Sequence, residues 1–407
     1  MLFRSYGSTS VSIEVTPEEL ALDTTDVNTL SVESALDSIV LWNRENADLV
    51  VTDTGVEDNL LLTDLFDSLL VLTSNEETVR AVEKMHPAAL KGLTVSQEAV
   101  SIGVSKALSR HVNQELNTLD CAKEEKDYSA WISYLGDALN QDSKSYKGSA
   151  QVGYRSSMAG FAAGADYKVL DFLTVGALTG FTSSHVNFQQ DRGSGDVNTG
   201  YFGLYLSTVG EGFFGSLSTT AGWNDYSARR RIQYTGVDLT ADSEHGGRQL
   251  LTHLDVGLNL PVGVLNIRPF NQFDYLSQEE YAYDERGAGD WNLHVNKSTS
   301  IFMRNELGLQ FARCFPFNKG KITLRPKLSW VREVRTKGSK YTASFKDARD
   351  FPFVVTGLFP DRSLFSTGVS VTGDLFEDKL SFSAYYDGEF ASSYSENRYG
   401  GEVRVSF

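Results

Sequence analysis

Histidine and carboxylate side chains are the groups of this chain that could perform acid–base chemistry near neutral pH. The 407 residues include six histidines, and His253 stands two positions before Asp255 in an alternating segment. That spacing puts both side chains on one face of a strand but hinders direct contact, although a water molecule could bridge them. We interpret the pair as solvated charges rather than a catalytic dyad. The sequence therefore predicts no enzyme and no catalytic residue.

Cysteine chemistry is equally sparse. The chain has two cysteines, Cys121 and Cys314, and no Cys-x-x-Cys pair. This excludes a cysteine zinc site and a scaffold held together by many disulfides. A bridge between the two would need Cα atoms within ~7 Å, and we interpret both as unpaired. No metal site and no cofactor site is predicted.

Charge divides the chain into two parts. The net charge of −16 argues against a nucleic-acid partner, because binding phosphates requires a basic face. Residues 1–127 carry 23 acidic and 9 basic side chains, whereas the remainder carries 30 acidic and 28 basic ones. The break near residue 127 coincides with a change in hydrophobic period, so we expect a separate domain over 127–407.

In that domain apolar and polar residues alternate, as in a strand whose two faces meet different surroundings. The last segment places Tyr399, Val403, Val405 and Phe407 on the apolar face. Twelve such segments of roughly ten residues can be counted, at 129–137, 160–169, 173–183, 199–208, 213–227, 248–260, 265–276, 300–315, 321–333, 364–375, 379–390 and 398–407. The opposite face carries charged residues, among them His253, Asp255, Arg304, Glu306, Arg325 and Lys327.

Some connections between these segments are tight, whereas 189–198, 229–247, 279–297 and 334–362 are long and polar. This layout is typical of an all-β transmembrane barrel of about twelve antiparallel strands, with lipid outside and a wet lumen inside. The six charged residues are then expected to face the lumen. A soluble up-and-down barrel or a β-sandwich also alternates, but the strand number and the loop asymmetry favour the membrane barrel. The run Arg229-Arg230-Arg231 is expected to form a solvated or headgroup-facing rim.

The residues before the barrel have a different period. Residues 1–53 are rich in Thr, Ser, Asp and Val and are expected to be strand fragments or a disordered acidic segment. Apolar residues recur at helical spacing from about 60 to 116, and Ser74 before Glu77 is a capping-box pattern that predicts a helix start. We therefore expect a helical linker over 54–126. The first ten residues lack the apolar core of a signal peptide, so we expect the natural chain to start further upstream.

Taken in order, these features resemble the translocator, or β-domain, of autotransporters, the type V secretion proteins of Gram-negative bacteria. The resemblance covers roughly residues 54–407. It rests on Val82 to Leu90 before the barrel, Ser129-Ala130-Trp131-Ile132, Gly160 to Tyr167, Tyr226 with Arg229 to Ile232, Arg268-Pro269-Phe270, Glu285 to Gly289, and the terminal Phe407. In the family the C-terminal residues, here Tyr399, Val403, Val405 and Phe407, are read by the barrel-assembly machinery.

The resemblance implies a helix that threads the pore, here residues 90–116, joined to the first strand through 120–127. A helical cap packed outside the barrel is the alternative. Residues 1–53 would be the end of a passenger, although about fifty residues are too few for a β-helical passenger. Some family members cut themselves at paired asparagines in the helix; because Asn113 and Asn117 are separated, we predict no self-cleavage.

The function implied is that of an integral outer-membrane translocator that anchors and exports or displays its N-terminal passenger. The partners implied are outer-membrane lipid, the barrel-assembly machinery, periplasmic chaperones and the passenger itself. A porin-like channel plugged by its N-terminal helix is the main alternative, and an outer-membrane enzyme is a third.

Overall fold

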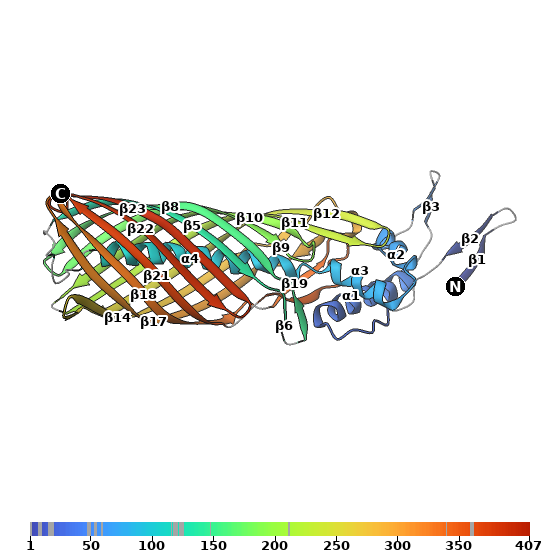
Figure 1. Ribbon diagram of the computed structural model, residues 1–407. Helices are drawn as coiled ribbons and strands as arrows, with labels where there is room; N and C mark the ends of the chain where they lie inside the picture. The colour runs from blue at the N-terminus through green and yellow to red at the C-terminus, as the bar shows by residue number, and fades with distance from the viewer. Residues whose placement is uncertain are drawn as a thin grey trace.

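The computed structural model describes residues 2–6, 10–14, 20–46, 50–52, 55–57, 60–114, 116, 121, 126–146, 148–210, 212–338, 340–358 and 362–407. In this part of the chain, twelve long antiparallel strands form a closed barrel (Figure 1). They are β5 (Tyr128–Gln141), β8 (Tyr154–Leu170), β9 (Leu173–Phe188), β10 (Gly193–Val209), β11 (Phe213–Tyr234), β12 (Val237–Leu258), β14 (Leu265–Glu280), β17 (Ser298–Phe317), β18 (Gly320–Lys337), β21 (Arg362–Leu375), β22 (Leu380–Ala391) and β23 (Tyr394–Ser406). The predicted fold class is confirmed.

The first and last strands close the barrel. β23 pairs with β5 from Tyr394 opposite Gln141 to Ser406 opposite Ser129. Phe407 and Tyr128 then exchange backbone hydrogen bonds of 3.0 and 3.1 Å. Because each of the twelve barrel strands has two neighbours, the barrel wall has no open edge that could pair with another chain.

Because side chains alternate along each strand, the outer face of this wall is apolar and the inner face is largely polar. Large apolar residues such as Ile132, Leu204 and Leu328 point outward and are exposed, whereas their sequence neighbours, such as Ser133, are buried inside. An outward apolar band around a polar interior matches a barrel whose solvent is lipid on the outside. No helix in the described part of the chain is long and apolar enough to span a membrane.

The two ends of the barrel differ. One end, which we call the turn end, carries short connections such as residues 171–172 and 318–319 and also holds the C-terminus. At the other end, two of the four predicted long loops are wrong. β9 and β10 are joined by only 189–192, and β11 and β12 continue as one long hairpin that turns at residues 235–236, where Gly236 has a φ of 82°. The end of the β11–β12 hairpin resembles a loop in composition because it extends beyond the apolar band of the barrel wall.

The other two long connections fold into a small sheet. β15 (Tyr283–Asp284), β16 (Leu293–Val295), β19 (Lys340–Phe345) and β20 (Phe353–Thr356) pair in that order, with η2 (Gly289–Trp291) between β15 and β16. The link from β5 to β8 contains a further hairpin, β6 (Lys144–Tyr146) and β7 (Ser149–Gln151). The short β13 (Leu260–Val262) extends the wall beyond β12 at the turn end.

Three helices cover the loop-bearing end: α1 (Val27–Asn46), α2 (Thr63–Leu70) and α3 (Asn75–Met85). Their apolar faces share one core with the small sheet and with the β11–β12 hairpin, where Leu36 and Ile39 pack with Ile232, Phe345 and Phe353. We call these helices, the small sheet and the hairpin extension the cap. Figure 1 shows the cap at the barrel end opposite the C-terminus.

The sequence prediction for residues 1–53 is wrong over 27–46. Short strands do occur as β1 (Leu2–Tyr6) with β2 (Ser10–Glu14) and β3 (Val50–Thr52) with β4 (Gly55–Glu57), but α1 is a helix of 20 residues. Its Ser, Thr, Asp and Val content has modest helix propensity, yet Val32, Leu36, Ile39 and Val40 form a stripe that the cap buries. The predicted start at Ser74 is confirmed: its Oγ accepts a 3.3 Å hydrogen bond from the Glu77 amide.

Candidate functional site: the helix-filled lumen

A helix of 23 residues, α4 (Lys91–Asn113), runs through the barrel after a short turn, η1 (Ala88–Leu90) (Figure 1). All of its residues except Arg110 and Asn113 are buried. At about 1.5 Å per residue it is about 34 Å long, enough to fill the pore from the cap toward the turn end. The alternative of a helix packed outside the barrel is therefore wrong.

The wall around α4 has an apolar half. Val100, Val104 and Leu108 of α4 lie in one cluster with residues of β5, β8, β9 and β10, including Trp131 and Leu178. The expected wet lumen is therefore wrong on this side, where packed side chains fill the space between α4 and the wall. The helix closes off this half largely by direct packing, and most of its charged side chains meet the other strands.

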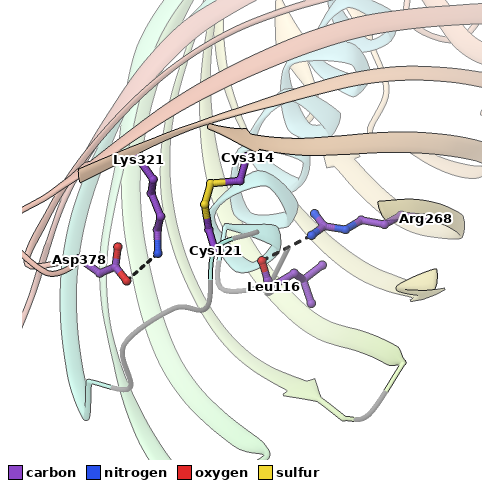
Figure 2. The surroundings of a disulfide bond; sticks show 6 residues. All are labelled: Leu116, Cys121, Arg268, Cys314, Lys321 and Asp378. Carbon is purple, nitrogen blue, oxygen red and sulfur yellow. Dashed lines mark hydrogen bonds and ion pairs between the residues drawn. A yellow bond between two sulfur atoms is a disulfide. The ribbon is translucent and has the colours of Figure 1, made fainter. Parts of the chain in front are cut away.

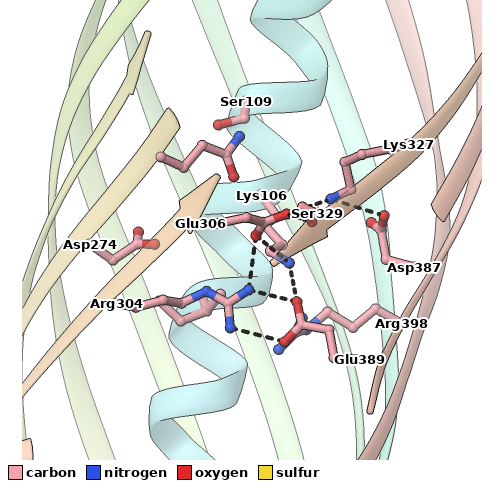
Figure 3. A network of polar contacts seen from close by, with 12 residues as sticks. Lys106, Ser109, Asp274, Arg304, Glu306, Lys327, Ser329, Asp387, Glu389 and Arg398 are labelled. Carbon is pink, nitrogen blue, oxygen red and sulfur yellow. Dashed lines mark hydrogen bonds and ion pairs between the residues drawn. The ribbon is translucent and has the colours of Figure 1, made fainter. Parts of the chain in front are cut away.

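The polar half of the wall centres on Lys106. Its Nζ forms ion pairs with Glu306, at 3.1 Å, and with Glu389. Arg304 joins the same two carboxylates, at 2.9 Å from Glu306 and 2.7 Å from Glu389 (Figure 3). One helix cation and one wall cation thus share two wall carboxylates, from β17 and β22.

Further cations complete this network. Lys327 lies 3.1 Å from Glu306 and 3.4 Å from Asp387, and Arg398 lies 3.0 Å from Glu389. Each buried carboxylate of the network therefore has more than one cationic partner. Desolvating ions costs several kcal/mol each unless partners are well placed, so this arrangement makes one depth and rotation of α4 preferable to others.

Ion pairs recur along α4 on either side of Lys106. Toward the cap, Glu98 accepts from Arg335 at 2.5 Å. Toward the turn end, Arg110 donates to Asp387 at 2.7 Å, and His111 bridges two carboxylates, lying 2.8 Å from Asp166 and 3.0 Å from Glu402. The helix is thus bound to strands on several sides of the barrel.

The prediction that His253 and Asp255 are a solvated pair is wrong, because both side chains are buried and each contacts other residues. His253 Nδ1 lies 2.7 Å from Asp274 Oδ1, and its Nε2 lies 2.7 Å from Ser109 Oγ on α4. Asp255 instead accepts from Gln272 at 3.0 Å. The pairing of His253 with Ser109 and Asp274 could not be predicted, because nothing local shows that His253 and Asp274 stand opposite each other on β12 and β14.

Ser109, His253 and Asp274 have the spacing of a nucleophile, a base and its orienting acid, but their setting differs from that of a hydrolase. Ser109 and His253 are 3% and 1% exposed, and Asp274 also accepts from Ser105 at 3.2 Å. Ser109 lies near the C-terminus of α4, where the helix dipole opposes a developing negative charge. The arrangement suits a link between helix and wall.

All six charged residues expected in the lumen are on the inner face. Five are buried, namely His253, Asp255, Arg304, Glu306 and Arg325, and Lys327 is nearly so. Arg325 donates to Thr372 Oγ1 at 2.9 Å and borders a small cavity beside Arg110. In the described residues, no group of three or more His, Cys, Asp or Glu side chains is placed to hold a metal ion.

Only part of the arginine run at 229–231 lies at a solvated rim, as was expected of all three residues. Arg229 is exposed, but Arg230 is buried and donates to both carboxylate oxygens of Glu285, at 2.8 and 2.6 Å. It also donates to the carbonyl of Met85, so it links hairpin, small sheet and α3. Nearby in the cap, burial and the positive charges of Arg192 and Arg230 lower the pKa of His86 to about 3.

The prediction that both cysteines are unpaired is wrong. Cys121 and Cys314 form a disulfide whose Cα atoms are 6.1 Å apart, across 193 residues of sequence (Figure 2). Cys314 lies on β17 three residues before the strand ends, at the turn end. Nearby, Arg268 donates to the carbonyl of Leu116 at 3.4 Å, so the chain after α4 is bound to the wall at two points.

The four residues expected to form the C-terminal signal lie on the outer face. Tyr399, Val403, Val405 and Phe407 are all exposed. The Phe407 ring stacks on Tyr128, with centroids 6.1 Å apart, and Tyr128 stacks on Tyr167 at 4.8 Å. This aromatic row marks the outer rim of the turn end, where the first and last strands meet.

Known proteins share this architecture. A family profile described as "Autotransporter beta-domain" matches residues 130–387. The translocator domain of the autotransporter NalP from Neisseria meningitidis aligns with a TM-score of 0.61 and 15% identity, over 79% of this chain and 100% of that one. The β-domain of the Bordetella autotransporter BrkA gives a TM-score of 0.52 and 17% identity, over 69% of this chain and 100% of that one.

A longer relative matches almost the whole chain. An extracellular serine protease of Serratia marcescens is 24% identical over 417 residues, which are 97% of this chain and 38% of that protein. The chain thus spans less than half the length of this curated relative. Since the family profile covers more than half of the chain and the closed barrel agrees with it, the chain belongs to the autotransporter β-domain family, whose barrel is an integral translocator of the bacterial outer membrane.

Proposed function

We propose that the barrel anchors and exports or displays a passenger located N-terminal to α4. The path of the chain is the observation that carries this proposal. The described residues from 20 to the start of α4 lie at the cap end, α4 passes through the lumen, and β5 begins at the turn end beside Phe407. Any segment ahead of the cap is therefore continuous with the strand wall only through the pore.

The orientation follows from the loops. Outer-membrane barrels carry short turns on the periplasmic side and longer loops outside, so the turn end faces the periplasm and the cap lies at the cell surface. The outward apolar side chains contact membrane lipid. The row ending at Phe407 is the signal for the barrel-assembly machinery, and periplasmic chaperones hold the unfolded strands before insertion.

The barrel itself is not an enzyme in this proposal. The Ser109–His253–Asp274 link is buried and binds α4 to the wall. The Serratia relative is named for proteolysis, but this chain spans only 38% of it. Activity of that kind would belong to a passenger.

A display assay tests the proposal. An epitope placed ahead of residue 20, behind a secretion signal, should be removed by protease added to intact cells. Deleting residues 82–120 should abolish this exposure while the barrel still shows heat-modifiable migration on a gel. An epitope that stays protected although the full-length barrel is folded would contradict export.

A porin-like channel plugged by α4 is the second candidate, supported by the filled lumen. Both functions predict that conductance rises when residues 82–120 are removed. Only the translocator predicts that the epitope is displayed by the full chain and lost with the helix.

A further inference from the structure

The disulfide joins the stretch that follows α4 to the barrel wall. α4 ends at Asn113, Cys121 comes eight residues later, and β5 begins at Tyr128. Cys121 and Cys314 are both buried, at 8% and 3% exposure, near the periplasmic mouth of the lumen. The bond therefore divides the stretch between α4 and β5 into two shorter tethers.

The lengths of these tethers decide how far α4 can move toward the cell surface. To leave the lumen, a helix of about 34 Å must travel about its own length. The 15 residues from Asn113 to Tyr128 extend to about 50 Å, which is ample. The eight residues from Asn113 to Cys121 reach only about 28 Å. With the disulfide formed, about one helical turn must stay inside the barrel.

We infer that Cys121 and Cys314 are an oxidation site for a periplasmic thiol–disulfide oxidoreductase, and that the bond formed there is a latch that keeps the pore helix in the barrel. The two thiols lose two protons and two electrons, and the disulfide of the oxidoreductase takes them up to become a dithiol. The thiols meet only when β17 is in the wall and the end of α4 is at the periplasmic mouth. Oxidation is therefore the closing step of assembly.

The latch and the ion pairs restrain α4 in different ways. The pairs around Lys106 oppose the first displacement of the helix, whereas the disulfide limits the total displacement. Removing the bond alone leaves the helix held by its ion pairs. The test therefore needs a background in which those pairs are weakened.

Four full-length proteins separate the two restraints in single-channel recordings: wild type, Cys121→Ser/Cys314→Ser, Lys106→Met, and the triple variant. Folding of each protein is first checked by heat-modifiable migration. The disulfide in wild type and in Lys106→Met is checked by resistance to maleimide labelling. We expect Lys106→Met to show partial openings only and the triple variant to show full openings like those of a chain lacking residues 82–120. Dithiothreitol should convert Lys106→Met to the behaviour of the triple variant and leave the triple variant unchanged.

Equal conductance of Lys106→Met and the triple variant, in oxidised and reduced forms, would overturn the latch. Oxidised protein from cells without a periplasmic dithiol oxidase, at wild-type yield, would overturn the assigned partner. The latch concerns the pore helix of the proposed translocator, and the display assay separates the two failures. Loss of display with intact latch behaviour contradicts export alone, whereas normal display without a latch effect contradicts this inference alone.

Discussion

Replacing Lys106 by methionine removes the cation that binds two buried carboxylates of the wall. Methionine keeps the unbranched shape and the helix propensity of the lysine stem, so the change acts mainly on charge. Glu306 keeps Arg304 and Lys327 as partners, and Glu389 keeps Arg304 and Arg398. The variant therefore weakens the network without leaving a carboxylate alone.

The magnitude follows from distance and burial. A pair at 3.1 Å, the separation of Lys106 Nζ from Glu306, has a Coulomb energy of about 5 kcal/mol at an effective dielectric constant of 20. Burying the ammonium costs several kcal/mol, which methionine does not incur, and breaking buried pairs costs about 3–5 kcal/mol in total. Because the other cations stay, we expect the lower figure, a loss of about 3 kcal/mol in the free energy of unfolding.

Urea unfolding of the barrel in lipid vesicles, followed by tryptophan fluorescence, measures this loss. Ser96→Ala on the same helix is the matched control. Its Oγ is buried and has no hydrogen-bond partner among the described residues, so its removal should not lower stability. High salt should leave the difference between the two variants unchanged, because buried pairs are poorly screened. Equal stabilities for Lys106→Met and Ser96→Ala would refute the claim that the network holds the helix.

Three further outcomes are expected. A fluorophosphonate probe should not label the folded protein, because Ser109 is buried and bound to the wall; labelling that Ser109→Ala abolishes would reveal a nucleophile. The purified full-length chain should run as one band, and fragments that break near 113–117 would contradict the absence of self-cleavage at Asn113. Phe407→Ser should lower the yield of folded barrel in the outer membrane several-fold. Phe376 is an exposed aromatic residue in a turn at the same end, and Phe376→Ser should leave the yield unchanged. Equal yields of the two variants would contradict the role assigned to Phe407.

The strands and much of the pore helix could be read from local patterns. Each of the twelve predicted segments overlaps one barrel strand, since strand alternation depends on neighbours two positions apart. The predicted helix 90–116 agrees with α4 within three residues. Local patterns failed where a segment leaves the membrane-spanning wall. The β11–β12 extension was interpreted as a loop, and α1 was missed although its apolar stripe was present.

Only part of the candidate site could be predicted from the sequence. Alternation placed Glu306 and Lys327 on the inner face, but not which charge each would meet. Lys106 and Glu389 are 283 residues apart, and Ser109 and His253 are 144 apart. Such pairs depend on the register of the strands and on the rotation of α4, which no local spacing encodes.

By itself the sequence determined a barrel of about twelve strands with an apolar exterior and a helical segment ahead of it, because lipid and lumen impose a two-residue period that every strand repeats. Only the tertiary structure decided that the helix fills the lumen, that the cap covers its mouth, that Arg230 is buried and that Cys121 meets Cys314. The physical reason is that each of these depends on contacts between segments far apart in the chain, and such contacts exist only once the barrel has closed.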